Sequence, residues 1–109
     1  MAVDEKLAEK VRNSLMGLKG MNEKKMFGGL CFLMNGNMVC GVLGDRIIVR
    51  TGPEKYEEAL NMKHASVFDL TGRKMKGFVY VAPEGVKRKD SLAKWLKMGL
   101  DYASTLPKK

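Results

Sequence analysis

Two cysteines, Cys31 and Cys40, have the spacing that most directly suggests chemistry in this sequence. They flank Asn35-Gly36, a dipeptide typical of a two-residue hairpin turn. In such a hairpin the numbers of opposed residues sum to 71, so Cys31 faces Cys40, with the two Cα atoms about 4.5 Å apart. This register allows a redox-sensitive thiol pair. The alternative is two reduced, buried cysteines that pack as small apolar side chains.

Two glycine-containing segments have the composition of anion-binding loops. Gly28-Gly29 is followed by a predicted strand and not by a helix, so a bulge or a close backbone approach explains the pair better. Arg50-Thr51-Gly52 precedes a predicted helix, whose free N–H groups favour a negative charge. Because acidic residues already occupy the first turn of that helix, an ordinary strand-to-helix turn is the competing interpretation.

The residue types give no sign of a catalytic or metal-binding constellation. His64 is the single histidine, and its spacing suggests no Ser/His/Asp or Cys/His arrangement. Together with Cys31 and Cys40 it supplies three soft ligands, whereas structural zinc usually takes four. We therefore expect a protein that is not an enzyme, with no catalytic residue, metal or cofactor.

Charge gives the most useful functional signal. The chain has 20 Lys and Arg against 12 Asp and Glu, for a formal net charge of +8 at pH 7. Residues 73–97 hold eight of the basic residues against two acids, Glu84 and Asp90. These eight are the candidate contacts for an anion or a nucleic acid: Arg73, Lys74, Lys76, Lys87, Arg88, Lys89, Lys94 and Lys97. The competing interpretation is a solvated surface that keeps the protein soluble.

Hydrophobic periodicity and turn residues predict the elements that position these side chains. Three helices are expected, at residues 3–18, at residues 53–62 and from a cap at Asp90 or Ser91 onwards. Five strands are expected, at residues 25–34, 38–43, 46–50, 67–70 and 78–81. The order is αβββαββα, which predicts an α+β domain with an antiparallel sheet and helices packed on one side.

A length of 109 residues suits one domain with a modest core, so we take residues 1–109 as a single unit. No apolar run approaches the roughly 20 residues of a membrane span. Residues 1–10 are of mixed charge and lack the apolar core of a signal peptide. Since two cysteines are also too few for a secreted disulfide scaffold, we expect a cytoplasmic protein.

The motif Lys25-Met26-Phe27-Gly28-Gly29 carries a family resemblance together with later segments. These are Val49–Glu54, Lys63-His64-Ala65, Met75–Val81 and the ending around Thr105-Leu106-Pro107. In them the chain resembles the N-terminal domain of the TfoX/Sxy family, bacterial regulators associated with natural competence. The resemblance implies a fold similar to that of secretion chaperones, in a short stand-alone form without the C-terminal domain of longer members. The resemblance implies no catalytic residues.

The resemblance and the charge together predict a small regulatory or binding module. By resemblance it acts through protein–protein contact in competence or transcription regulation, with a protein partner that the sequence does not name. The alternative is a nucleic-acid-binding accessory protein that uses the basic band at residues 73–97. A homodimer is compatible with either function, and no contact with a membrane is expected.

Overall fold

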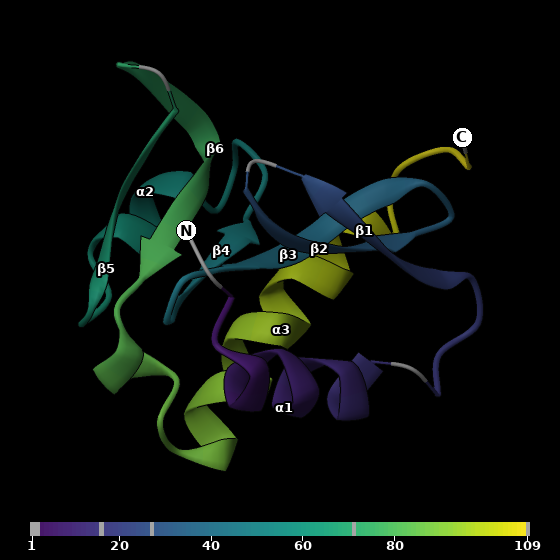
Figure 1. The fold of residues 1–109 in the computed structure, drawn as a ribbon. Coiled ribbons are helices and arrows are strands. Elements are labelled where there is room, and N and C mark those ends of the chain that lie inside the picture. Colours follow the sequence, from purple (N-terminus) through teal and green to yellow (C-terminus); the bar gives the residue numbers. More distant parts are fainter. Residues whose placement is uncertain (1–2, 16, 27, 71, 109) are drawn as a thin grey trace.

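A six-stranded antiparallel sheet organises the molecule in a computed structural model that describes residues 3–15, 17–26, 28–70 and 72–108. Its elements are α1 (Glu5–Leu15), β1 (Met21–Met26), β2 (Gly29–Met34), β3 (Asn37–Leu43), β4 (Arg46–Arg50), α2 (Tyr56–Leu60), β5 (Ala65–Leu70), β6 (Arg73–Val81), the 3-10 helix η1 (Pro83–Gly85) and α3 (Lys89–Ala103). The strands lie in the order β1-β2-β3-β4-β6-β5 (Figure 1). The predicted α+β class and antiparallel sheet are confirmed.

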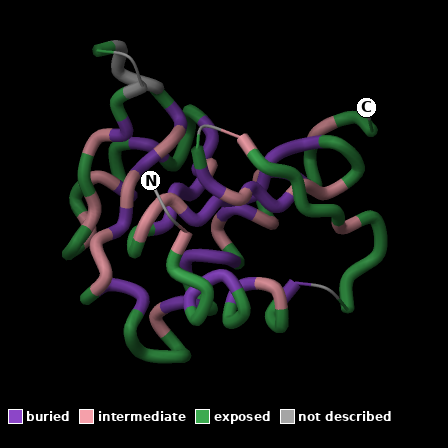
Figure 2. Tube along the Cα trace, viewed as in Figure 1, coloured by how far each residue is buried: buried purple, intermediate pink, exposed green. Residues whose placement is uncertain are grey.

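All three α-helices cover the same face of this sheet. α3 packs against β3 and β4, α2 packs against β5 and β6, and α1 packs against α3. The main core joins Leu15 of α1, Tyr56 of α2 and Trp95 of α3 to strand residues such as Phe32 and Val49. Figure 2 shows buried stretches where α1 and α3 approach the strands. The expectation of helices on one side is therefore also confirmed.

A second, smaller cluster lies on the opposite face of the sheet, which we call the helix-free face. Its buried members are Cys31, Met38, Ile48 and Phe68, and its half-buried members are Met26, Leu43, Phe78 and Tyr80. Every one of these residues comes from a strand, whereas the three helices all contribute to the main core. The two faces of the sheet thus bury apolar side chains in different ways.

The β1–β2 hairpin corrects the predicted order of elements. The single strand expected at residues 25–34 is two strands, which pair with Met26 opposite Gly29. Gly28 has a φ of +75°, a left-handed conformation that glycine adopts at little cost, so the chain reverses here. A Cβ at Gly29 would collide with the carbonyl oxygen of Val42, which confirms the expected close backbone approach. Phe27 lies outside the described residues.

The edge strand β1 is held to α1 by an ion pair. The Arg12 guanidinium donates to both carboxylate oxygens of Glu23, over distances of 2.8 and 2.9 Å. These hydrogen bonds and the charge of Arg12 hold the pKa of the Glu23 carboxyl below its ordinary value. The pair attaches a polar strand, MNEKKM, to the body of the fold.

Two other boundaries differ from the prediction. β6 already begins at Arg73, so the basic residues expected in a connection lie in a strand. The N-cap of α3 is Arg88, and no side chain bonds to the helix from that position. The Asp90 carboxylate instead accepts from the N–H of Ser91 and from the Arg88 guanidinium. The predicted cap at Asp90 or Ser91 is therefore wrong.

Candidate functional site

The turn that follows β4 is fixed by hydrogen bonds to β6. The backbone N–H groups of Thr51 and Gly52 both donate to the carbonyl oxygen of Gly77, over 2.7 and 3.2 Å. The Thr51 hydroxyl, on a residue that is 1% exposed, points at the carbonyl oxygens of Gly52 and Gly77. Gly52 has a φ of +80° and lies against Tyr102 so closely that a Cβ would collide with its ring. The turn is thereby held against α3.

A cleft of about 550 Å³ lies between this turn and α3. The residues that line it are Thr51, Pro53, Glu54, Lys55, Lys94, Lys97, Met98, Asp101, Tyr102 and Thr105. Its volume falls in the range of roughly 300–1,000 Å³ that is common for ligand sites. Pro53, Met98 and the Tyr102 ring supply apolar surface, so the cleft can hold an apolar side chain as well as a charged group.

Three lysines and two carboxylates line the cleft, with Glu54 and Lys55 on one wall and Lys94, Lys97 and Asp101 on the other. Lys97 Nζ lies 3.0 Å from Asp101 Oδ2, and Lys55 Nζ lies 3.8 Å from Glu58 Oε2. Lys94 has no hydrogen bond or ion pair with any side chain that the structure describes. All three ammonium groups are exposed. A carboxylate or phosphate brought by a partner therefore finds one free cation and two that are weakly engaged.

Arg50 lies next to the cleft, between the aromatic rings of Phe78 and Tyr102. Its guanidinium carbon lies 5.3 Å from the ring centroid of Tyr102 and 5.5 Å from that of Phe78. Both distances fit cation–π contacts. The sequence suggested an anion site where Arg50-Thr51-Gly52 meets a helix N-terminus, but α2 begins at Tyr56 and has five residues. The turn supplies a wall of the cleft and not a helix-terminal anion site.

The eight basic residues predicted between positions 73 and 97 do not form one continuous band. Arg73, Lys74 and Lys76 lie in β6, and Lys87, Arg88 and Lys89 follow the other end of that strand. At 3.3 Å per residue the two ends of β6, Arg73 and Val81, lie roughly 26 Å apart, so the two groups lie toward opposite ends of this strand. The side chains of Arg73 and Lys74 lie outside what the structure describes.

The remaining two basic residues, Lys94 and Lys97, line the cleft. Their partner across it, Lys55, was not singled out in the sequence, and neither were Asp101 and Tyr102 as site residues. A signal was present, because positions 94, 97 and 101 are spaced by three and four and share one face of a helix. Nothing in the sequence linked that face to the turn after β4.

The structure corrects the predicted pairing of the cysteines. The expected register holds for Met34 opposite Asn37 and for Leu33 opposite Met38, and it then shifts by one residue. Beyond the shift, Phe32 pairs with Cys40 and Cys31 pairs with Gly41. Because successive side chains alternate between faces, the extra residue moves Cys40 into the main core, while Cys31 joins the helix-free face. The two thiols do not face each other.

Both cysteines are free and buried. Burial raises the pKa of the Cys31 thiol to about 11. Burial and the neighbouring Cys31 raise the pKa of Cys40 still further. Because the thiolate is the reactive form, neither side chain is a nucleophile at neutral pH. These observations favour the interpretation of two small apolar residues over that of a redox pair.

The described part of the chain offers neither a metal cluster nor a membrane-spanning helix. Across residues 3–15, 17–26, 28–70 and 72–108, no three His, Cys, Asp or Glu side chains cluster so that they could hold a metal ion. The single histidine, His64, is exposed, with a φ of +73°. Among the described helices, none has both the length and the apolar content needed to cross a membrane.

Comparison with known proteins supplies a family. The model of the TfoX N-terminal domain matches residues 13–103. That span contains the whole sheet, the turn that forms one wall of the cleft and all of α3. A search of curated proteins found no match.

Proposed function

The chain belongs to the family of the TfoX N-terminal domain, and on this basis we propose that it is a regulatory module that acts by contact with another protein. The observation that carries the proposal is the cleft beside α3. It combines apolar surface from Met98 and Tyr102 with a free cation at Lys94. We propose that a partner in the cytoplasm places an acidic group at Lys94 and Lys97 and an apolar side chain against Tyr102.

The side chains of the cleft support binding and not catalysis. The Thr105 hydroxyl donates to the carbonyl oxygen of Tyr102 over 2.6 Å, and the Thr51 hydroxyl is directed at two backbone carbonyls. An activated nucleophile instead needs its hydroxyl proton held by a general base. Of the two carboxylates in the cleft, Asp101 is engaged by Lys97, and the Thr51 and Thr105 hydroxyls bond to backbone carbonyls and not to Glu54. These groups are therefore suited to recognition.

A charge reversal at Lys94 tests the proposal. Wild-type protein, Lys94→Glu and Lys89→Glu would be used as baits in an extract of the native host, and the retained proteins compared by mass spectrometry. Both residues are exposed on α3, but Lys89 does not line the cleft. We expect the same proteins to be retained by wild type and Lys89→Glu and to be lost with Lys94→Glu. Equal loss with both variants would contradict a role for the cleft.

The alternative function is nucleic-acid binding by residues 73–97. What favours it is the exposed run Lys87, Arg88 and Lys89, although Arg88 already pairs with Asp90 over 3.2 Å. In the same experiment, this alternative predicts that retention depends on Lys89 and disappears after nuclease treatment. It also predicts binding to unrelated DNA that falls steeply with salt, since phosphate contacts release counterions.

A further inference from the structure

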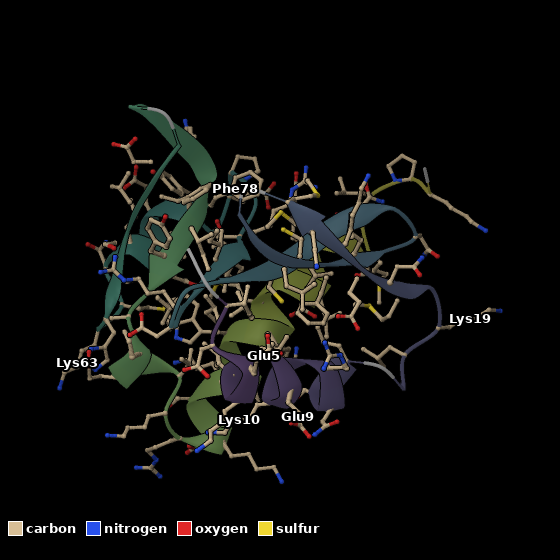
Figure 3. The ribbon with its side chains drawn as sticks, viewed as in Figure 1. Glu5, Glu9, Lys10, Lys19, Lys63 and Phe78 are labelled. Carbon is tan, nitrogen blue, oxygen red and sulfur yellow. The ribbon has the colours of Figure 1, made fainter. Side chains whose placement is uncertain are left out.

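The helix-free face carries charge of one sign. The register places on it Asn22, Lys24 and Met26 of β1, Cys31 and Leu33 of β2, Met38, Gly41 and Leu43 of β3, Arg46, Ile48 and Arg50 of β4, Ser66 and Phe68 of β5, and Phe78 and Tyr80 of β6. Among these described residues there are three cations and no carboxylate. Figure 3 shows Phe78 on the side of the sheet away from α1. Among the residues that the register assigns to it ahead of the shift in β5 and β6, the face is apolar at its centre and its charged side chains are cations.

The two arginines of β4 are held by aromatic rings of β6. The guanidinium carbon of Arg46 lies 5.7 Å from the ring centroid of Tyr80, and that of Arg50 lies 5.5 Å from that of Phe78. The Arg50 guanidinium carbon also lies 5.3 Å from the ring centroid of Tyr102 in α3. Neither arginine has a hydrogen bond or ion pair with another described side chain. A guanidinium that packs on a ring keeps its N–H donors in a rigid fork, which suits bidentate binding of a carboxylate. The guanidinium N–H groups of Arg46 and Arg50 are therefore available to an acceptor on this face.

The spacing of the arginines matches that of an extended peptide. Arg46, Ile48 and Arg50 alternate along one strand, so the two arginines start about 13 Å apart at 3.3 Å per residue. An extended chain that runs along β4 has the same rise per residue. Its side chains at positions 1 and 5 therefore reach the two guanidinium groups. The side chain at position 3 meets the apolar surface over Ile48, which the half-buried Leu43 and Tyr80 line.

We propose that the helix-free face binds an extended acidic segment of a partner protein, with carboxylates four residues apart and an apolar side chain midway between them. A second copy of this chain does not fit, because two identical cationic faces repel. A single-stranded nucleic acid fits less well. Its bases need open ring faces, and guanidinium groups already lie over Phe78 and Tyr80. This surface meets the cleft at Arg50, whose guanidinium also lies over the Tyr102 ring of the cleft wall. The cluster at its centre lies on the opposite face of the sheet.

A designed peptide tests the proposal directly. The probe is a fluorescein-labelled peptide that contains Glu-Ser-Leu-Ser-Glu, with its affinity measured by fluorescence anisotropy at low ionic strength. We expect Arg46→Glu to weaken binding about tenfold or more, because an attraction becomes a repulsion. Lys89→Glu makes the same change of charge at an exposed site outside both this face and the cleft, and it should alter the affinity less than twofold. A peptide with its glutamates three residues apart should bind severalfold more weakly to the wild-type protein.

Two further measurements keep the outcome decisive. Arg46→Gln removes the charge but keeps a planar side chain for the ring, so it separates a charge effect from misfolding, which circular dichroism would report. Backbone amide shifts should change on β3, β4 and β6 and not at Lys94 and Lys97 of α3. Equal weakening by Arg46→Glu and Lys89→Glu, shift changes confined to α3, or tighter binding of an oligothymidylate of equal charge would each overturn the proposal.

Discussion

The two faces of the sheet exclude water by different means. Phe32, on the helix-covered face, is fully buried in a core to which α1, α2 and α3 all contribute. Phe68, on the helix-free face, is 1% exposed although only strand residues surround it in its cluster. The rings of Phe78 and Tyr80 lie near it, with centroids at 6.2 and 4.9 Å. A residue can thus be buried by half-exposed neighbours, and those neighbours remain available to a partner.

The largest expected effect contrasts the two buried phenylalanines. Phe32→Ala should lower the free energy of unfolding by about 3–5 kcal/mol, since a cavity forms between the sheet and rigid helices. Phe68→Ala should cost less, about 2 kcal/mol, because the half-buried side chains of the helix-free face, which no helix covers, can collapse into the space. Urea unfolding of both variants measures the difference. If Phe68→Ala costs as much as Phe32→Ala, the helix-free face is as rigid as the core.

A smaller difference in stability is expected between alanine substitutions of two glycines, one at each face of the sheet. A Cβ at Gly99 of α3 would lie 2.5 Å from the carbonyl oxygen of Val39, so Gly99→Ala forces the helix away from β3. We expect a loss of about 2 kcal/mol. A Cβ at Gly41, on the other face, would meet Cys31 Sγ at 3.2 Å and Leu30 O at 3.4 Å.

Gly41→Ala should change stability by no more than about 0.5 kcal/mol, because the small overlap is offset by the gain from replacing a strand glycine. Thermal unfolding of the two variants side by side gives the comparison. A greater loss for Gly41→Ala than for Gly99→Ala would mean that the helix-free cluster tolerates less change than the contact between helix and sheet.

At neutral pH the smallest effect on stability comes from ionisation of the two thiols, one on each face. Both have a folded-state pKa above the unfolded value of about 8.5. Their contribution to stability is therefore complete below about pH 8.5 and is lost as pH rises toward the folded-state values. Alkylation followed by mass spectrometry should find both thiols unreactive at pH 7 and Cys31 reacting first as pH approaches 11. Urea-unfolded protein provides the control, and earlier labelling of Cys40 would contradict the assignment of faces.

The sequence predicted some of the elements that form the two faces of the sheet and missed others. The second and third strands around Asn35-Gly36 and the apolar stripe of α3 follow from periodicity and turn residues, which are local properties. β1 was not predicted as a separate strand. An edge strand exposes most of its residues, so Met21–Met26 shows no alternation of apolar and polar residues. The bulge beside Phe32 was not predicted, because one extra residue has no local signature in the sequence. It nevertheless places Cys40 on the face opposite to that of Cys31.

The candidate cleft could not be predicted from the sequence either, because it depends on contacts between residues that are far apart in the chain. Its two walls, the turn at Thr51–Lys55 and the helix positions Lys94–Thr105, are about 40 residues apart in the chain. Charge along the sequence pointed to Lys94 and Lys97 but grouped them with Arg73 and its neighbours, which lie in β6. Which basic residues share a surface depends on how strands and helices pack, and that is a tertiary property.

The hydrogen bonds between Gly77 and the turn after β4 have an entropic consequence. A loop that orders upon binding loses conformational freedom, and this loss subtracts from affinity. In this protein the N–H groups of Thr51 and Gly52 are already fixed on Gly77, and Gly52 already rests against Tyr102. A partner that enters the cleft meets a wall that is ordered in advance, so more of its contact energy remains as affinity.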